Sequence, residues 1–541
     1  MAKLSEREPV RHGTNVETTS TGDHTTRGEP DNKFGLWRNI KQHPHAVAWS
    51  IMLSTAVIME GFDIVLIQSL LAVDSFKKAF GSQLPDGTYQ LTAAWQAGLT
   101  NGAIVGEMLG LMVNGLIADR FGFKKTMLGA LAATTALIFI PFFATSVIQL
   151  LVGLILLGIP WGVFQTLTTT YAAEVCPTGL RPYLTTYVNL CWVIGQFLAS
   201  GVLVGVQGRS DHWAYRIPYA LQWIWPVPLM VGVLFAPESP WWLTRRERKD
   251  EARRVLKRLN RTGTPDHVIE DVLSMMKQTN DLESMTHEGT SYLDCFKGID
   301  LRRTEIACAV WLIQTLAGAT FMGYSTYFYE SAGLESKYAF SLSLGQYALG
   351  AIGTILSWFL MSYAGRRTLY LSGLATLGAL FLIVGFCGLA PESNQASRWA
   401  IGSMLLLFIF AYDCTIGPVC YCLVAEIPST RLRQKTVVLA RTTYNIGSII
   451  CNIIVTRQLN PTAWNWGAKS GFFWAGSCFI CFTWAFFRLP EPSGRTFLEL
   501  DALFMNKTPA RKFKSANAQL DFGREFDDPL PKGPETEHRE V

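Results

Sequence analysis

Twelve long apolar stretches dominate this sequence and constrain its fold more than any other feature. The hydrocarbon core of a bilayer is about 30 Å thick, and a helix needs about 20 apolar residues to cross it. Stretches of that length occur in two sets of six, near 46–73, 93–118, 124–146, 148–172, 183–206 and 216–236, and near 303–329, 340–363, 367–389, 399–424, 435–457 and 468–489. The pattern predicts an all-α membrane protein with twelve transmembrane helices.

The composition agrees with this interpretation. Charged residues make up 16% of the 541 residues, whereas soluble proteins carry about 25%. This shortage excludes a soluble enzyme, a nucleic-acid-binding protein and a disordered chain. The net charge of +5 is too small to imply a polyanionic partner such as nucleic acid.

The charges that are present gather in the two tails and in a central segment. They predict a polar tail over 1–45, a six-helix bundle over 46–236, a helical linker over 237–301, a second six-helix bundle over 302–490 and a tail over 491–541. The positive-inside rule places both termini and the linker in the cytoplasm, because basic residues concentrate in the linker and in the short loops that hold Arg120, Lys124, Lys125, Arg181, Arg366, Arg367, Arg431, Arg433 and Lys435.

The sequence offers no pattern for a metal site, a cofactor or catalysis. Most of the 11 cysteines lie within predicted spans, and no histidines occur at ligand spacing, so buried thiols are a better interpretation than metal ligands or disulfides. No phosphate-binding loop or nucleophile–base pattern appears. We therefore expect no enzyme activity, no metal and no cofactor.

Three motifs recur at matched helix ends in the two halves. Such an ordered repeat indicates two bundles related by an axis along the membrane normal, as in transporters that rock around a central site. The pairs are Asp119-Arg120 with Gly365-Arg366-Arg367, Glu174 to Arg181 with Glu426 to Arg433, and Pro237-Glu238-Ser239-Pro240 with Pro490-Glu491-Pro492-Ser493.

The charged residues of these motifs are candidates for a cytoplasmic gate. Ion pairs between them would form when the inner side is shut and break when it opens. The alternative is that the basic residues only determine topology. The candidates are Asp119, Arg120, Glu174, Arg181, Glu238, Arg366, Glu426 and Arg433.

Over 46–500 the chain resembles the sugar porter family of the major facilitator superfamily. The resemblance rests on the PESPWWL block at 237–243, the GRR block at 365–367 and the PEPSGRT block at 490–496. The stretch 158–169 and the EGFD block at 60–63 are similar to the fungal maltose permease, or α-glucoside:H⁺ symporter, branch. The resemblance implies proton-driven uptake of a disaccharide by a monomer in a fungal plasma membrane.

Five charged residues lie deep inside predicted spans. A charge at mid-membrane costs about 2.5–3.5 kcal/mol on insertion scales, so it marks a functional site by default, although a polar lock between helices is the alternative. Protonation of crowded carboxylates would weaken their attraction to an arginine in the other half and free the carrier to reorient. The candidates for proton coupling are Glu60, Asp63, Glu107, Asp413 and Arg441.

Two positions depart from the family pattern. Proton-coupled sugar porters commonly place an arginine in the fourth span, where this chain has Leu154, so we infer that Arg441 replaces it. Ser362 stands where the family has an aspartate before the GRR block. The second gating contact is therefore expected to be weaker than the first.

A sugar site needs neutral hydrogen-bonding groups and an aromatic face. The resemblance implies cavity-facing roles for Gln196, Gln314, Thr320, Tyr324, Tyr421, Tyr444 and Asn445. Thr315, Thr320 and Tyr421 replace residues usual in the family, which suits a sugar larger than or different from glucose. The same side chains could instead cross-link helices.

The main hypothesis is therefore import of a maltose-like α-glucoside together with protons. One alternative is transport of another sugar, such as a hexose or cellobiose, coupled or facilitative. A non-transporting sugar sensor is a further alternative, although sensors of this fold usually carry a long cytoplasmic tail and only about 50 residues follow the last span here.

Overall fold

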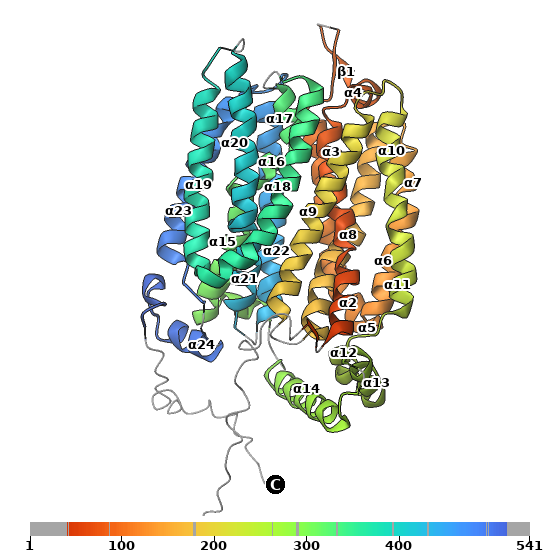
Figure 1. Cartoon of the computed structure of the whole chain (residues 1–541), viewed down its shortest axis with the longest axis vertical. Helices are drawn as coiled ribbons and strands as arrows, with labels where there is room; N and C mark the ends of the chain where they lie inside the picture. The colour runs from red at the N-terminus through yellow and green to blue at the C-terminus, as the bar shows by residue number, and fades with distance from the viewer. Residues whose placement is uncertain are drawn as a thin grey trace, which may run out of the picture.

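The computed structural model describes residues 40–516, apart from 42, 86, 177–179, 262, 288–290, 332–333, 392–393, 430–431, 494 and 496. Most of the predicted tails 1–45 and 491–541 therefore lies outside the described residues. The described chain is a bundle of long, roughly parallel helices (Figure 1). A short hairpin of β1 (Ser82–Gln83) and β2 (Tyr89–Gln90) marks one end of the bundle, called the hairpin end below.

The first half of the bundle contains the six predicted spans of the first set. Their apolar sequences form helices because a helix satisfies its own backbone hydrogen bonds in lipid. The spans are α2 (Pro44–Ser54) with α3 (Val57–Leu70), α5 (Ala93–Phe121), α6 (Phe123–Leu137) with α7 (Phe139–Phe142), α8 (Val147–Val175), α9 (Arg181–Val206), and α10 (Trp213–Leu221) with η2 (Gln222–Ile224) and α11 (Pro226–Phe235). The short helix α4 (Asp74–Phe80) precedes the hairpin.

The second half repeats the arrangement. Its spans are α15 (Gly298–Leu316) with α16 (Ala319–Gly323) and α17 (Ser325–Ser331), α18 (Ser336–Tyr363), α19 (Arg366–Cys387), α20 (Gln395–Cys414) with α21 (Ile416–Glu426), α22 (Arg433–Leu459) and α23 (Ser470–Arg488). Figure 1 shows the two halves side by side. The chain thus has two six-helix bundles, as predicted.

Eleven helical stretches of the described residues are long and apolar enough to span a membrane. The predicted span 303–329 is the twelfth, and it differs because it is divided into α15, α16 and α17. Gly318, between α15 and α16, has a left-handed φ of 98°, which glycine adopts at little cost. This break leaves no single long apolar helix at that position.

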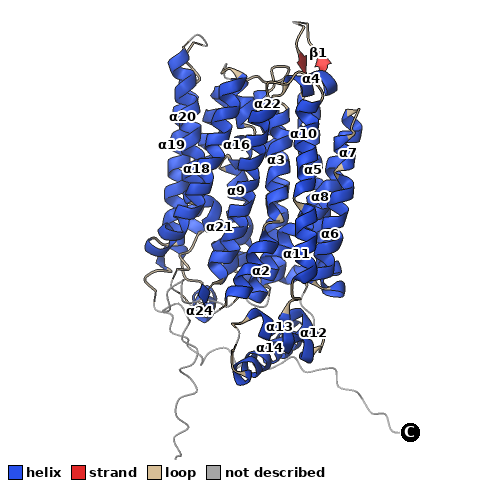
Figure 2. Cartoon of the chain, turned by 45° about the vertical axis from the view of Figure 1, so that its right-hand side comes forward, coloured by secondary structure: helices blue, strands red, loops and turns tan. Residues whose placement is uncertain are grey.

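The linker helices lie below the first half, at the end opposite the hairpin (Figure 2). They are α12 (Pro240–Arg245), α13 (Lys249–Leu259) and α14 (Asp266–His287), followed by η3 (Tyr292–Phe296). Leu256, Ile269 and Met276 form a small apolar core between them. The helix α24 (Phe497–Met505) lies at this same end, called the linker end below.

Glycines allow close helix crossings around the deep acidic residues. A Cβ on Gly158 of α8 would lie 2.8 Å from the backbone nitrogen of Glu107, and one on Gly162 would lie 2.7 Å from that of Leu111. Gly61 of α3 meets the backbone of Trp192 on α9 in the same way. Small residues let membrane helices approach to backbone contact, so these crossings fix the positions of Glu60 and Glu107.

The two halves are joined by hydrogen bonds and an ion pair near the hairpin end. Lys77 pairs with Glu330 at 3.3 Å, and Gln90 donates to the Tyr327 hydroxyl at 2.5 Å. The Asn460 side chain donates to the carbonyl of Leu91 at 3.0 Å. These contacts close the hairpin end of the seam between the halves.

Candidate functional site

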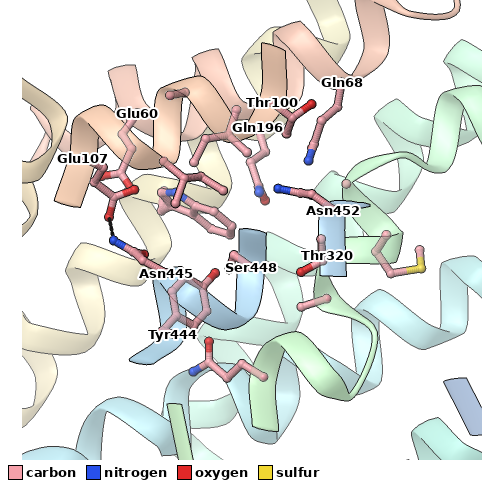
Figure 3. A pocket seen from close by; sticks show the side chains of 18 of the residues that line it. Glu60, Gln68, Thr100, Glu107, Gln196, Thr320, Tyr444, Asn445, Ser448 and Asn452 are labelled. Carbon is pink, nitrogen blue, oxygen red and sulfur yellow. Dashed lines mark hydrogen bonds between the residues drawn. The ribbon is translucent and has the colours of Figure 1, made fainter. Parts of the chain in front are cut away.

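A cavity lined by both polar and apolar side chains lies between the two halves. Its empty volume is about 1040 Å³, including the part that opens to solvent. The first half contributes Glu60, Gln68, Thr100, Glu107, Gln165, Asn189, Trp192 and Gln196, and the second half contributes Gln314, Thr320, Tyr347, Tyr412, Asp413, Tyr421, Arg441, Tyr444, Asn445, Ser448 and Asn452, together with several apolar residues. Figure 3 shows labelled members of this set pointing into the cavity from helices of both halves.

Three of the predicted charged residues meet at one end of the cavity. The Nη2 atom of Arg441 lies 2.9 Å from Oε1 of Glu107 and 3.7 Å from Oε1 of Glu60. These residues are 8%, 3% and 0% exposed, respectively. Two carboxylates of the first half therefore share one guanidinium of the second half in a buried site, where electrostatic interactions are strong.

Neutral amides complete this cluster. Gln165 donates to Oε1 of Glu60 at 2.6 Å, and Asn445 donates to Oε1 of Glu107 at 3.4 Å. Oε2 of Glu60 is buried without a hydrogen-bond partner among the described residues. That oxygen is a ready position for a proton, because a protonated carboxyl carries its proton on one oxygen while the other still accepts a hydrogen bond.

Aromatic rings cover the guanidinium of Arg441. Its Cζ atom lies 4.9 Å from the ring centre of Trp311 and 4.6 Å from that of Tyr444. Tyr421 packs edge-on against Trp311 at 5.0 Å. Cation–π contacts of this kind stabilise a desolvated arginine, so Arg441 is held firmly on its own half.

Asp63 lies apart from this cluster. Its carboxylate is buried and accepts a hydrogen bond from Gln222 of η2, and it is not among the residues that line the cavity. Asp413 does line the cavity, at a site where glycine makes room for it, since a Cβ on Gly350 would lie 2.6 Å from its Oδ2. Asp413 has no ion pair with any residue that the structure describes.

Six of the seven predicted sugar ligands line the cavity. Gln196, Gln314, Thr320, Tyr421, Tyr444 and Asn445 do so. Tyr324 is 1% exposed and donates its hydroxyl to Thr100 across the two halves at 3.0 Å, so it closes the wall instead. Gln314 accepts from the Tyr412 hydroxyl at 3.1 Å.

Several polar residues of the cavity wall were not predicted from the sequence. Ser448 and Asn452 follow Tyr444 and Asn445 at helical spacing on α22, a pattern that predicts a shared face. Gln68 lies two turns beyond Glu60 on α3 in the same way. The missed set is Gln68, Thr100, Gln165, Asn189, Trp192, Tyr347, Tyr412, Ser448 and Asn452.

The motif acids at the linker end cap helices symmetrically. Glu238 accepts the backbone N–H of Phe123 at 2.9 Å, at the start of α6, and Glu491 accepts that of Arg366 at 2.9 Å, at the start of α19. Carboxylates stabilise helix N-termini through these orphan donors. Burial raises the pKa of the Glu238 carboxyl, and its hydrogen bonds from backbone N–H groups oppose that rise.

Ion pairs accompany both caps. Glu174 pairs with Arg245 of α12 at 2.9 Å and also accepts from the Ser239 hydroxyl. Glu426 pairs with Arg366 at 3.2 Å. Neither ion pair crosses the seam. The first joins α8 to the linker, and the second lies within the second half.

The remaining gate candidates take different positions. The carbonyl of Asp119, and not its carboxylate, accepts from Trp242 at 3.0 Å and from Arg246 at 2.7 Å. Arg120 lies 5.6 Å from the ring centre of Phe121. Arg433 begins α22 and is partly buried. Arg181 begins α9, and its side chain lies outside the described residues, so its expected part in the gate stays a prediction.

Comparison with known proteins gives three consistent results. A family model described as "Sugar (and other) transporter" matches residues 49–504. A maltose permease of Saccharomyces cerevisiae is 44% identical over 507 residues, covering 92% of this chain and 81% of the permease. A general alpha-glucoside permease of the same yeast is 41% identical over 520 residues, covering 95% of this chain and 84% of that protein.

Solved structures of similar fold include the xylose transporter XylE from E. coli in a partially occluded inward open conformation. The TM-score is 0.69 with 16% identity, over 84% of this chain and 100% of that one. This likeness concerns the fold alone.

Proposed function

The chain belongs to the sugar (and other) transporter family, and from this premise we propose that it imports a maltose-like α-glucoside together with protons by alternating access. The observation that carries the proposal is the pairing of 44% identity to a maltose permease with a central cavity that holds two carboxylates and one arginine. The protein is thus a membrane transporter and not an enzyme.

The neutral wall of the cavity is the proposed sugar site. Gln196 and Gln314 offer amide donors and acceptors, and Nε2 of Gln314 is buried without a partner among the described residues. Thr320, Tyr421, Tyr444 and Asn445 add hydroxyl, phenol and amide groups. Sugar hydroxyls can satisfy such groups while their C–H faces pack on the aromatic rings.

The proposed proton-coupling site is the cluster of Glu60, Glu107 and Arg441. When neither acid is protonated, two negative charges hold the guanidinium of the opposite half. A proton on Glu60 leaves one carboxylate for one guanidinium, and the attraction between the halves falls. The loaded carrier can then reorient more readily, and proton release resets the stronger attraction.

Asp63 and Asp413 remain candidates for a part in coupling. Asp63 is held by Gln222 behind the cavity wall, and Asp413 lies in the cavity wall of the second half. A proton on either one changes the charge around the cavity without touching the Glu107–Arg441 pair. We propose that they modulate proton coupling and that Glu60 and Glu107 are the residues on which coupling depends.

The linker end is the proposed cytoplasmic gate. The paired caps at Glu238 and Glu491 and the ion pairs Glu174–Arg245 and Glu426–Arg366 fix the ends of each bundle as rigid bodies. We propose that Asp119, Arg120, Arg181 and Arg433 complete this gate when the inner side shuts. The two bundles, over 46–236 and 302–490, would then move as units.

The proposed setting is the plasma membrane, with both termini and the linker in the cytoplasm. The basic residues at the linker end support this orientation. The partners are the sugar, protons and the lipid bilayer, and the working unit is a monomer. The chain 517–541 lies outside the described residues.

Two alternatives follow from the sequence interpretation. The cavity could serve another sugar, such as a hexose or cellobiose, in coupled or facilitated transport. A sugar sensor on the same fold would bind sugar without moving it.

Uptake into vesicles that contain the purified protein separates these alternatives. Labelled maltose, trehalose, cellobiose and glucose are offered with and without an imposed pH gradient, acidic outside. We expect maltose to accumulate only with the gradient. Uptake that is the same with and without the pH gradient would contradict coupling to protons. Binding of sugar without uptake would favour a sensor.

A further inference from the structure

The cavity wall has two chemically different ends. Three helices that line it each carry a charged residue at one level and a neutral polar residue at another. Figure 3 shows Glu60 and Glu107 at one side of the cavity and Gln68, Thr100 and Asn452 at the other. The pairs are Glu60 and Gln68 on α3, Glu107 and Thr100 on α5, and Arg441 and Asn452 on α22.

The helix geometry gives the distance between these ends. With a rise of 1.5 Å per residue, the two levels are about 12 Å apart on α3, about 10 Å on α5 and about 16 Å on α22. We call the level of Glu60, Glu107 and Arg441 the charged pole, and the level of Gln68, Thr100 and Asn452 the neutral pole.

The neutral pole lies toward the hairpin end. Thr100 is near the start of α5, which follows Leu91 in the chain. The Leu91 carbonyl accepts a hydrogen bond from Asn460 across the seam. Asn452 is near the end of α22, which runs to Leu459. The long axis of the cavity therefore follows the bundle axis, from the closed hairpin end inward to the charged cluster.

A single sugar ring is too short to reach from one pole to the other. Two linked rings can extend along this axis, with one ring at each pole. A disaccharide can thus make contacts at the neutral pole that a hexose seated near the charged pole cannot make.

Asn452 has the hydrogen-bonding capacity for such a contact. Its Nδ2 donates to Oδ1 of Asn101 across the seam at 2.9 Å. Its Oδ1 is buried with no hydrogen-bond partner among the described residues, and the side chain lines the cavity. A buried acceptor left unpaired is unfavourable, and a sugar hydroxyl entering the cavity can satisfy it.

We propose that Asn452 is a specificity-determining residue, which accepts a hydroxyl of the sugar ring at the neutral pole and so favours two-ring α-glucosides over single hexoses. The inference rests on the proposed transport of an α-glucoside. Gln68 and Thr100 form the rest of this subsite wall.

If Asn452 had a purely structural role, the expected effect of its substitution would be different. In that case its only task is the bond to Asn101, which links the two halves. Asn101 is not among the residues that line the cavity, and its own Nδ2 donates to the carbonyl of Ile449 at 3.3 Å. Asn101→Ala therefore breaks this cross-seam bond together with the one to Ile449 and leaves the Asn452 amide in place, which makes it the control for the structural role.

The test compares the dissociation constants of maltose and methyl α-glucoside, a one-ring analogue, for the purified full-length protein. Asn452→Ala should weaken maltose binding about tenfold, the loss of one hydrogen bond, and leave methyl α-glucoside unchanged. Asn101→Ala should leave both constants unchanged. Asn452→Leu, which keeps the approximate size of the side chain but has no acceptor, provides a second variant with the same expected loss of preference should the alanine variant fail to fold.

Equal weakening of both sugars by Asn452→Ala would overturn the proposal. So would an effect of Asn101→Ala that matches that of Asn452→Ala, since it would show that only the cross-seam bond matters. A wild-type protein that binds neither sugar would instead overturn the proposed function itself, and the inference with it.

Discussion

Arg441 of α22 and Glu107 of α5 form a buried ion pair of 2.9 Å that joins the two halves of the bundle. A second carboxylate, that of Glu60, lies 3.7 Å from the same guanidinium. The half that carries the acids and the half that carries the base must change their relative position during alternating access. The strength of this contact is therefore tied to the transport cycle.

Removal of Arg441 should destabilise the protein strongly. Arg441→Gln leaves two carboxylates buried without their cation, and breaking a buried pair costs about 3–5 kcal/mol. We expect a clearly lower Tm in detergent. The double variant Arg441→Gln with Glu107→Gln should recover part of that loss, because one uncompensated charge is gone. A single variant with wild-type Tm would contradict the assignment of the pair.

The glycine crossing beside Glu107 should tolerate no side chain. A Cβ on Gly158 meets fixed backbone, with the Glu107 nitrogen at 2.8 Å, so Gly158→Ala should cost about 1–3 kcal/mol by overpacking. Gly129 of α6 is the control, because a Cβ there meets nothing within 4 Å. Gly129→Ala should stabilise by about 0.5–1 kcal/mol. Equal Tm values for the two variants would show that α5 and α8 are not in backbone contact.

The burial of the Glu238 carboxyl should make stability depend on pH. Burial raises the pKa of Glu238 in the folded protein, so its contribution is fully present below the pKa of the unfolded chain and is lost as pH rises through the folded value. Glu238→Gln stays neutral and lacks this loss. The Tm of the variant relative to wild type should therefore rise between pH 4.5 and pH 7.5. A difference in Tm between the variant and wild type that is constant with pH would show that Glu238 does not cause the pH dependence of stability.

Much of the fold could be predicted from the sequence, because hydropathy and length determine which segments can cross a bilayer. The first set of six spans and the repeated motifs illustrate this, since each predicted span contains a helix. The division of the span near 303–329 was not predicted, because hydropathy does not report the left-handed turn at Gly318.

The site was predicted less completely. Glu60 and Asp63 are three residues apart on one helix, and three residues advance a helix by 300°, so the two side chains diverge by about 60°. In a crowded bundle this is enough to send Asp63 toward Gln222 and Glu60 toward Arg441. Gln68 and Asn452 were missed although each lies at helical spacing from a predicted site residue, Glu60 for Gln68 and Asn445 for Asn452. Hydropathy alone does not report how far along that face the cavity extends.

Coupling through Glu60 is tested most directly by proton movement. Maltose is added to vesicles that contain the protein and an internal pH dye, at equal pH on both sides, and sugar-induced acidification of the interior is recorded. Labelled maltose counterflow is measured in the same vesicles to show that the carrier still moves. Glu305→Gln, at an exposed carboxylate that pairs with Arg488, is the matched control.

We predict that wild type and Glu305→Gln acidify the vesicles, whereas Glu60→Gln shows maltose counterflow with no sugar-induced proton entry. Proton entry at the wild-type rate in Glu60→Gln would contradict the account.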